Sequence, residues 1–300
     1  MRQRIITGIL FTLGVALFIV PAYWHPLPSL ILFSLVALQA SREIVQALRI
    51  KGLKPNLVVA SLGSLLMILT VVGSSQFNER FGRGANIGFT EQLAGGFALM
   101  AFVLLATMSF SVIALLIKRG PEALPDAVAT AAVMAYVAFP LSCPVLLTQE
   151  VKGGWLWLLV GLATPWISDC FAYFTGFLIG RHPIIPAISP KKTLEGCLGG
   201  MAGSMLVLPL IFQLFRHTLD IRGNLTPGVI VFAVVSGLVL SIASQFGDWL
   251  ASGIKRWCGI KDFGKFLPGH GGIMDRFDSA FFTLPMALAL AVLFQMIFAQ

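Results

Sequence analysis

The stretch SIASQFGDWLASGIKRWCGIKDFGKFLPGHGGIMDRFDS, residues 241–279, decides how this chain is interpreted. It begins inside an apolar run, crosses a basic loop and ends where another apolar run begins. It holds four of the thirteen acidic residues and five of the twenty-one Lys and Arg, although only 11% of the chain is charged. Such dense polar chemistry between two apolar runs indicates a functional site at a membrane surface.

The composition of the whole chain is typical of a polytopic membrane protein. The 300 residues are 57% hydrophobic, with a mean hydropathy of +0.88. Soluble domains are roughly 45–50% apolar and about 25% charged. Apolar runs of about 18–25 residues recur, the length that spans the hydrocarbon core as a helix. We therefore expect an all-α integral membrane protein, organised as one helical bundle.

Run lengths and helix-breaking residues predict about nine transmembrane helices. The run after MRQR is followed by a poor cleavage site, so we interpret it as an uncleaved first span and not as a signal peptide. The predicted spans are residues 5–23, 27–48, 56–73, 92–117, 127–148, 154–180, 197–215, 228–252 and 280–298.

Lys and Arg are distributed unevenly over the loops between these spans. With a cytoplasmic N-terminus, sixteen of the twenty-one lie on the cytoplasmic side. Because cytoplasmic loops retain Lys and Arg, we expect this orientation, with the loops after the sixth and eighth spans in the cytoplasm. The five on the outer side are Arg80, Arg83, Lys152, Arg216 and Arg222.

The formal net charge of +8 fits the same interpretation, because basic loops bind anionic headgroups. A nucleic-acid partner is therefore not expected. The four cysteines form no CxxC pair, and the four His residues are not spaced to complete a zinc site. We expect neither a disulfide nor thiol chemistry.

One face of the span at 228–252 and of the turn after it is polar. Its residues are spaced so that they line one side of an α-helix. An aspartate at membrane depth is costly and normally faces a cavity, a partner or a cation. The alternative is a helix–helix contact through Ser and Gln hydrogen bonds. The residues on this face are Ser241, Gln245, Asp248, Ser252 and Lys255.

Asp275 and Asp278 stand three residues apart where the last span is expected to begin. On one face of a first helical turn, their charges repel unless a cation or a proton lies between them. Mg²⁺ takes oxygen ligands of this kind. With Asp248 they are predicted to lie at cytoplasmic helix ends and to hold metal. The alternative for the pair is that it only complements a helix dipole.

The loop KDFGKFLPGHGG, residues 261–272, lies between these acids. Its glycines, among them Gly271 and Gly272, allow backbone N–H groups to point into one concavity around an anion. Lys261 adds positive charge. His270 by itself is more typical of a loop hydrogen bond than of a ligand.

A second basic segment follows the sixth span and ends in SPKKTLEG, residues 189–196. Thr193 is placed to cap the next helix. The segment is interpreted as a phosphate-binding loop, and the alternative is a basic loop on an anionic membrane surface. Its candidate residues are Asp169 and Tyr173, on one helix face, and Lys191, Lys192 and Glu195.

Together these groups gather carboxylates for metals and lysines for phosphates on the cytoplasmic face. No Ser-His-Asp arrangement or covalent nucleophile is apparent in the sequence. The pattern is typical of phosphoryl-type transfer, where positioning and charge neutralisation dominate.

Residues 252–278, SGIKRWCGIKDFGKFLPGHGGIMDRFD, closely resemble the signature of the phosphatidate cytidylyltransferases, also called CDP-diacylglycerol synthases. QFGD at 245–248, SPKKTLEG at 189–196 and DxxAYxxG at 169–176 are also similar to that family. The resemblance covers about the C-terminal half. Where the family usually has a small pair after the aspartate, this chain has Cys170 and Phe171.

The resemblance implies the reaction CTP + phosphatidate → CDP-diacylglycerol + pyrophosphate. It also implies Mg²⁺ with a potassium ion beside it, a homodimer, and an active site on the cytoplasmic face of the bacterial inner membrane. Residues 1–150 are then a scaffold with a candidate dimer region, and residues 151–300 form the catalytic region of one integrated bundle.

The residues expected to carry this reaction fall into two sets. The catalytic set is Asp248, Lys255, Asp275 and Asp278, whose three aspartates are also the expected metal ligands. The substrate-binding set is Asp169, Tyr173, Lys191, Lys192, Glu195, Ser252, Arg256, Lys261, His270, Gly271, Gly272 and Arg276.

Two other functions fit part of the pattern. A CTP-dependent lipid or polyprenol kinase would release CDP in place of pyrophosphate. An ion-coupled transporter would use Asp169 and Asp248 as intramembrane carboxylates. Against the transporter are the missing internal repeat and the acids gathered at one membrane face.

Overall fold

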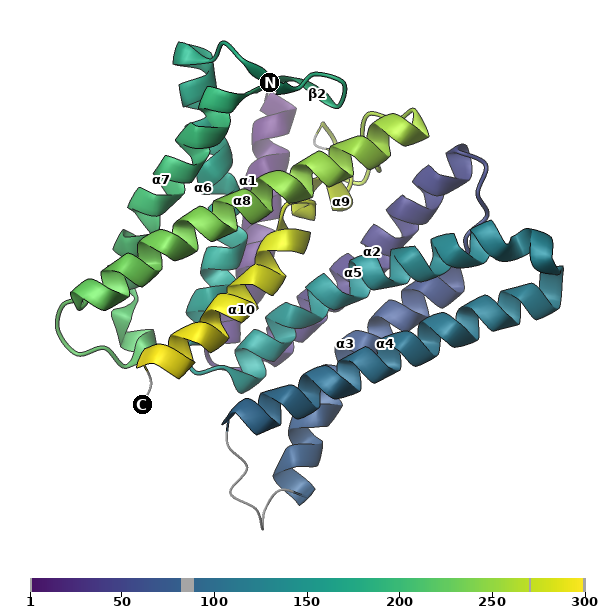
Figure 1. Ribbon diagram of the computed structural model, residues 1–300, viewed down its shortest axis with the longest axis horizontal. Helices are drawn as coiled ribbons and strands as arrows, with labels where there is room; N and C mark the ends of the chain where they lie inside the picture. The colour runs from purple at the N-terminus through teal and green to yellow at the C-terminus, as the bar shows by residue number, and fades with distance from the viewer. Residues whose placement is uncertain (1, 82–88, 270, 299–300) are drawn as a thin grey trace. The chain divides into compact units, whose positions relative to one another are not determined.

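The computed structural model describes residues 2–81, 89–269 and 271–298, and most of them are helical (Figure 1). This confirms the all-α class. The long helices are α1 (Arg2–Ile19), α2 (Leu27–Ile50), α3 (Leu57–Phe81), α4 (Phe89–Arg119), α5 (Leu124–Glu150), α6 (Gly154–Ile179), α7 (Leu194–Leu214), α8 (Pro227–Cys258) and α10 (Ala280–Phe298). The short elements are η1 (Pro21–Tyr23), η2 (Pro121–Ala123), η3 (Arg216–Leu219), α9 (Met274–Phe277) and the strands β1 (Pro183–Ile185) and β2 (Ser189–Thr193).

Eight helices within the described residues are long and apolar enough to cross a membrane. The chain is therefore an integral membrane protein. The predicted span at 56–73 corresponds to the shorter apolar stretch Leu57–Val72 of α3. The count of nine spans and the cytoplasmic N-terminus stay predictions.

The chain divides into two compact units. The first contains Met1–Glu150 and Trp257–Arg276, and the second contains Val151–Arg256 and Phe277–Gln300. The signature stretch therefore contributes to both units. Its basic loop belongs to the first unit, and most of α8 and all of α10 belong to the second.

In the first unit, α5 packs against α2, α3 and α4 (Figure 1). Met134 of α5 lies so close to Gly63 of α3 that a Cβ there would overlap the Met134 sulfur. Ser29 and Thr148 share a hydrogen bond of 2.9 Å between α2 and α5. Small residues and interhelical hydrogen bonds of this kind hold membrane helices together.

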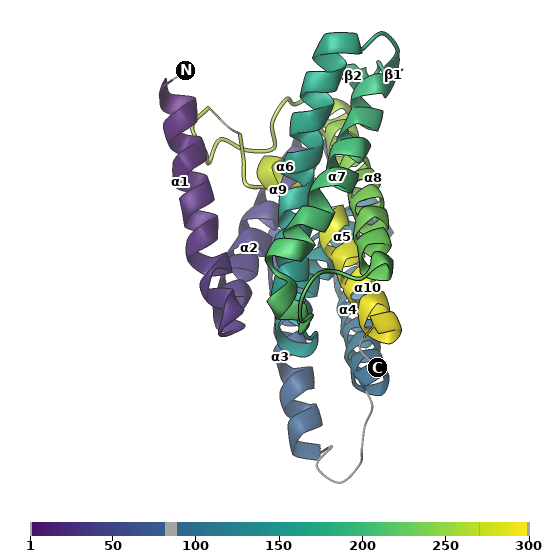
Figure 2. The same ribbon diagram turned by 90° about the vertical axis from the view of Figure 1, so that its left-hand side faces the viewer.

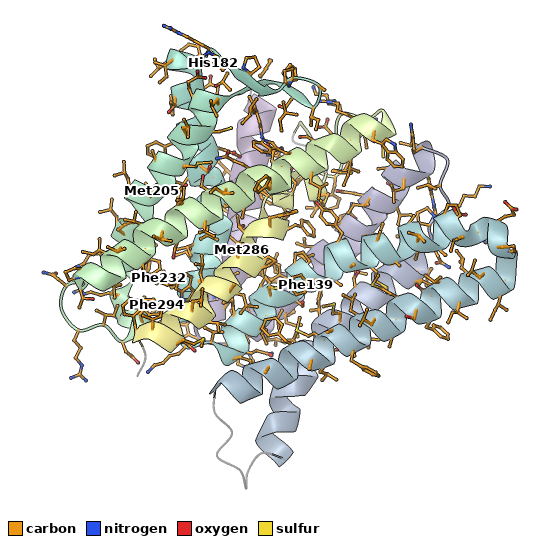
Figure 3. All side chains as sticks on the ribbon, in the orientation of Figure 1. Phe139, His182, Met205, Phe232, Met286 and Phe294 are labelled. Atoms are coloured by element: carbon orange, nitrogen blue, oxygen red, sulfur yellow. The ribbon has the colours of Figure 1, made fainter. Side chains whose placement is uncertain are left out.

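In the second unit, an aromatic cluster joins α6, α7, α8 and α10. The fully buried Trp157 has its ring centroid 5.2 Å from that of Phe212, 6.2 Å from Phe232 and 5.8 Å from Phe294. Figure 3 shows Phe232 and Phe294 side by side, with centroids 5.6 Å apart. Edge-to-face pairs of this kind add to the packing energy of the buried rings.

Glycines let α6 and α7 approach closely. A Cβ on Gly176 would lie 3.6 Å from Gly196 Cα, so two backbones meet there. A Cβ on Gly200 would lie 2.8 Å from the backbone oxygen of Ser168. Gly176 and Gly200 are therefore two of the positions at which these helices pack closely.

The segment after α6 is an ordered hairpin, and not the simple loop that the sequence predicted. Strands β1 and β2 pair antiparallel, with Pro183 opposite Thr193 and Ile185 opposite Ser189, at the end of α6 and α7 (Figure 2). The pairing was missed because both strands are short. The Thr193 side chain accepts a hydrogen bond from Gly196 N over 3.2 Å, which confirms the predicted cap of α7.

Replacing Gly200 with alanine is expected to lower the thermal unfolding temperature in detergent, because the added methyl group meets Ser168 backbone. Overpacking of this kind costs about 1–3 kcal/mol. Gly14→Ala in α1 is the matched control, since no atom lies within 4 Å of its ideal Cβ. Equal unfolding temperatures for the two variants would contradict the close α6–α7 contact.

Candidate active site

An amphipathic cavity of about 440 Å³ lies in the second unit, and we call it the amphipathic pocket. Its walls come from α6, β2, α7 and α8, and they combine aromatic, small and charged side chains. Such a lining suits a ligand with a charged group and an apolar body. The lining residues are Ser168, Asp169, Ala172, Tyr173, Gly176, Phe177, Lys191, Lys192, Thr193, Gly196, Cys197, Gln245, Asp248 and Trp249.

Two lysine–aspartate pairs lie at and beside this pocket. We call Lys192, Asp248, Lys255 and Asp278 the charge cluster. The Lys192 ammonium forms an ion pair with Asp248. Ser252 Oγ donates a hydrogen bond to Asp248 Oδ1 over 3.4 Å. Lys255 Nζ lies 3.9 Å from Asp278 Oδ2, and both side chains are largely buried. Each carboxylate thus has a positive neighbour, which offsets part of the cost of removing it from water.

The pKa of Lys192 depends on burial and on the other charges of the charge cluster and its pocket. Burial lowers the pKa of its ammonium group, because desolvation disfavours the charged form. The negative charges of Asp169 and Asp278 act in the opposite direction, and the positive charge of Lys255 adds to the lowering. Charges of α6, of α8 and of the segment just before α10 therefore act on one ammonium group.

Two buried polar atoms of the amphipathic pocket have no hydrogen-bond partner in the described part of the chain. They are Oε1 of Gln245 and Nε1 of Trp249. The orientation of the Gln245 amide is defined, because its Nε2 donates to the Cys197 backbone oxygen over 3.1 Å. Since buried polar groups are normally paired, one acceptor and one donor are left to meet a ligand.

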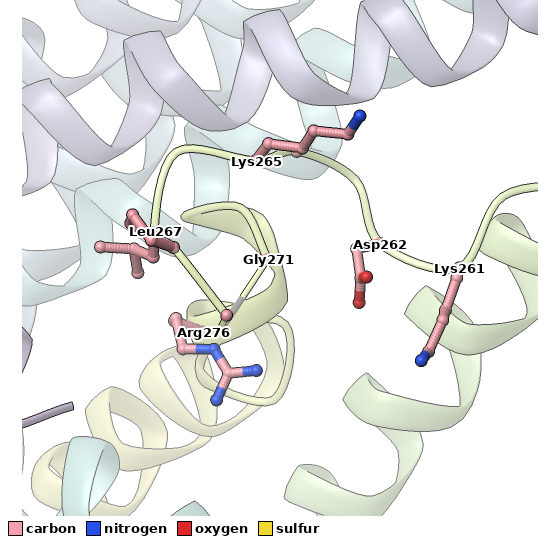
Figure 4. Close-up of a pocket in the computed structure, with 9 residues that line it drawn as sticks. Lys261, Asp262, Lys265, Leu267, Gly271 and Arg276 are labelled. Atoms are coloured by element: carbon pink, nitrogen blue, oxygen red, sulfur yellow. The ribbon is translucent and has the colours of Figure 1, made fainter. Parts of the chain in front are cut away.

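A more polar cavity of about 560 Å³ lies in the first unit, in the loop after α8, and we call it the basic pocket. Lys261, Lys265 and Arg276 line it together with one acid, Asp262. In Figure 4 the side chains of Lys261, Asp262 and Arg276 point to the same side of the loop, and Lys265 extends to the other. Excess positive charge around a glycine-rich loop suits phosphate groups.

The loop folds back on itself beside this pocket. Leu267 N donates to the Gly271 backbone oxygen over 2.9 Å. Gly269 and Gly271 have φ values of 79° and 86°, a conformation that favours glycine. Asp275 holds the loop from within, because its Oδ2 accepts backbone N–H groups of Phe263 and Gly272 over 2.8 and 2.9 Å.

No group of three His, Cys, Asp or Glu side chains among the described residues is placed to hold a metal ion. Of the three predicted ligands, Asp248 and Asp278 belong to the second unit and Asp275 to the first. The predicted metal site therefore stays a prediction.

A model of the cytidylyltransferase family matches residues 2–294. The chain belongs to the cytidylyltransferase family. It is therefore an enzyme of the nucleotidyltransferase class. The phosphatidate cytidylyltransferase of Staphylococcus saprophyticus is 32% identical over 258 residues, which are 86% of this chain and 87% of that protein.

Two other relatives bear the same name. The protein of Staphylococcus haemolyticus is 31% identical over 259 residues, 86% of this chain and 88% of its own. The protein of Staphylococcus epidermidis is 44% identical over 133 residues, 44% of this chain and 48% of its own. The similarity thus extends over most of the cytidylyltransferase chain, and not only over the signature stretch.

The two units bring most of the predicted site residues of this cytidylyltransferase into two groups. In the second unit, these residues line the amphipathic pocket or join the charge cluster: Asp169, Tyr173, Lys191, Lys192, Asp248, Ser252, Lys255 and Asp278. In the first unit, these residues line the basic pocket or fix its loop: Lys261, Gly271, Gly272, Asp275 and Arg276.

Two predicted substrate-binding residues, Glu195 and Arg256, line neither pocket. Glu195 accepts backbone N–H groups of Arg181 and His182 over 3.0 and 3.3 Å, so it holds the base of the hairpin. Arg256 Nε donates to a hairpin backbone oxygen over 3.4 Å. His270 lies outside the described residues. Their substrate roles stay predictions.

The sequence prediction missed Glu43 on α2. Its side chain is almost completely buried and bonds to the loop of the basic pocket. The available signal was an ionisable residue inside the apolar run at 27–48, since such residues in membrane helices mark functional positions.

Replacing Lys192 with methionine is expected to lower cytidylyltransferase turnover, because Asp248 loses its positive neighbour. Removing one positioned group that stabilises transition-state charge lowers turnover about a hundredfold to a thousandfold, and partial exposure of this pair reduces the effect, so a loss of about tenfold to a hundredfold is expected. The measurement is the initial rate of CTP consumption with the lipid acceptor.

Lys152→Met is the matched control, because Lys152 pairs with Asp220 at an exposed position. Exposed ion pairs contribute little, so this variant should keep wild-type turnover. If both variants lose activity equally, the role of the Lys192–Asp248 pair is refuted.

Proposed function

We propose that the protein is a phosphatidate cytidylyltransferase, which transfers the cytidylyl group of CTP to phosphatidate and releases pyrophosphate. The amphipathic pocket with its charge cluster is the observation that carries this proposal. The names of the relatives, which align over most of the chain, support it.

The amphipathic pocket is assigned to the lipid substrate. Ala172, Tyr173 and Phe177 of α6 supply apolar surface, and Lys191 and Lys192 of β2 supply positive charge. Phosphatidate has the same two parts, since a phosphate group is attached to a diacyl glycerol. A pocket lined by membrane helices allows the acyl chains to stay in lipid while the phosphate enters the charge cluster.

The basic pocket is assigned to the triphosphate of CTP. Lys261, Lys265 and Arg276 outnumber Asp262, so the pocket favours an anion. Contacts from Lys and Arg to phosphate oxygens are charge-assisted and stronger than neutral hydrogen bonds. The loop glycines also bring backbone N–H groups within reach of phosphate oxygens.

The proposed chemistry is a single in-line displacement. An oxygen of the lipid phosphate, already anionic, attacks the α-phosphorus of CTP. A new bond forms between these two atoms, the bond from the α-phosphorus to the bridging oxygen breaks, and pyrophosphate leaves with that electron pair. Lys192 and Lys255 neutralise phosphate charge, and no protein base is needed because the nucleophile carries no proton to remove.

The donor chemistry of the aspartates fits Mg²⁺, which prefers oxygen ligands. Asp248 and Asp278 are each balanced by a lysine ammonium, which a cation can replace as counter-charge. Asp275 has less capacity to bind a cation, because its Oδ2 already accepts two backbone N–H groups. Asp248 and Asp278 would hold the metal, which would supply Lewis-acid stabilisation of the phosphoryl oxygens, and Asp275 stays a predicted third ligand.

Four further features belong to the proposal. A potassium ion would accompany Mg²⁺, the protein would be a homodimer in the bacterial inner membrane, and its active site would face the cytoplasm. The asymmetric distribution of Lys and Arg supports the orientation. CTP is then available from the cytosol, while the diacyl chains remain in the bilayer.

The direct test uses purified protein, CTP labelled in the α-phosphate, phosphatidate and Mg²⁺. The label is expected in a CDP-lipid, with pyrophosphate as the other product and no product in the presence of a chelator. Release of CDP would indicate a lipid kinase. Cation-driven solute uptake into liposomes without CTP would indicate a transporter.

Asp278→Asn is expected to lower the rate of CDP-lipid formation by at least about a hundredfold, the usual order for a charge that stabilises a transition state. Asp220→Asn is the matched control, because Asp220 lies in an exposed ion pair with Lys152. Near-normal activity of folded Asp278→Asn protein would remove Asp278 from the mechanism.

A further inference from the structure

We infer that Glu43 is a positioning residue for the nucleotide: its buried carboxylate, on α2, holds the loop that forms the basic pocket. Glu43 is 1% exposed and lies in a membrane-spanning helix. A carboxylate at such a position is costly unless it is fully bonded. The assignment of the ligand as CTP rests on the proposed function.

The Glu43 carboxylate is bonded to backbone groups of the signature stretch. Oε1 accepts the N–H of Ile273 over 3.1 Å, and Oε2 accepts the N–H of Met274 over 2.8 Å. Gln39, one turn earlier on α2, donates its Nε2 to Oε1 over 2.8 Å. The carboxylate therefore connects α2 to a loop that lies 230 residues further along the chain.

Two glycines of the loop make room for this carboxylate. An ideal Cβ on Gly264 would lie 2.7 Å from Glu43 Oε1, and a Cβ on Gly272 would overlap the carboxylate. Neither glycine has a positive φ, so the backbone conformation does not require glycine at these two positions. The fit of the loop around Glu43 therefore accounts for both glycines.

The two residues that donate to Glu43 stand directly before two charged residues of the signature stretch. Asp275 and Arg276 follow Met274 in the chain, and Arg276 lines the basic pocket. Gly264 also lines this pocket, on the other side of the turn. If the Glu43 bonds were lost, the edge of the basic pocket that carries Arg276 would be released, while the amphipathic pocket in the second unit contains none of these residues.

Glu43→Gln tests this role with little change in size. The amide offers one acceptor oxygen, so one of the two backbone N–H groups faces an N–H₂ group. We expect the KM for CTP to rise about tenfold or more, as for the loss of one hydrogen bond to a charged group, and the KM for phosphatidate to stay unchanged. Glu43→Asp keeps the charge with a shorter reach and should give an intermediate KM for CTP.

Ser41→Ala is the matched control. Ser41 is fully buried on the same helix, and its hydroxyl has no hydrogen-bond partner among the described residues. This variant should leave both KM values unchanged. A similar rise in both KM values for Glu43→Gln would show general destabilisation and would overturn the positioning role.

Amide hydrogen exchange gives a readout that does not depend on turnover. In Glu43→Gln protein, peptides that contain Ile273 and Met274 should exchange faster, while peptides of α6 and α7 should not change. If Glu43→Gln does not fold, Gly264→Ala places a methyl group against the same carboxylate and should produce the same local effect. Unchanged exchange in the loop would overturn the inference.

The two readouts separate this inference from the proposed function. If wild-type protein forms no CDP-lipid, the proposed function fails, and thermal shifts with CTP then test the positioning role without the lipid. Stabilisation of the wild type but not of Glu43→Gln by CTP would support it. Equal stabilisation of both proteins would refute it.

Discussion

The bonds that hold carboxylates within apolar helices are the interactions on which this structure depends. An ionised carboxylate in such surroundings is destabilising unless positive groups or N–H donors surround it. Asp248 is bonded to Lys192, and Glu43 is bonded to the backbone of the signature loop. Each bond therefore fixes a segment outside the helices, and these segments line the two pockets.

The two pockets differ in chemistry as the two proposed substrates do. The amphipathic pocket combines the rings of α6 with lysines of the hairpin, so it suits a phosphate attached to acyl chains. The basic pocket has a net positive charge and less apolar surface, so it suits a polyphosphate. The signature stretch contributes to both units, which gives a physical reason for its length and for its dense charge.

The local features were predictable from the sequence, and the non-local ones were not. The helices, the Thr193 cap and the polar face of α8 follow from spacing over a few residues. The hairpin depends on pairing between two short strands, which sequence periodicity does not reveal. Glu43 meets its partners across 230 residues, so only the folded chain shows what its charge does. Glu195 is predicted to bind substrate from its place after two lysines, and only the folded chain shows that its carboxylate also accepts N–H groups at the hairpin base.

The proposed mechanism is one direct transfer between bound substrates, with no covalent intermediate on the protein. The stereochemical course at the α-phosphorus tests it most directly. CTP made chiral at this atom by sulfur substitution is converted with phosphatidate, and the configuration of the CDP-lipid is determined. Inversion is the predicted result, because one in-line displacement inverts the centre. Retention would require two displacements through a covalent enzyme intermediate and would contradict the account.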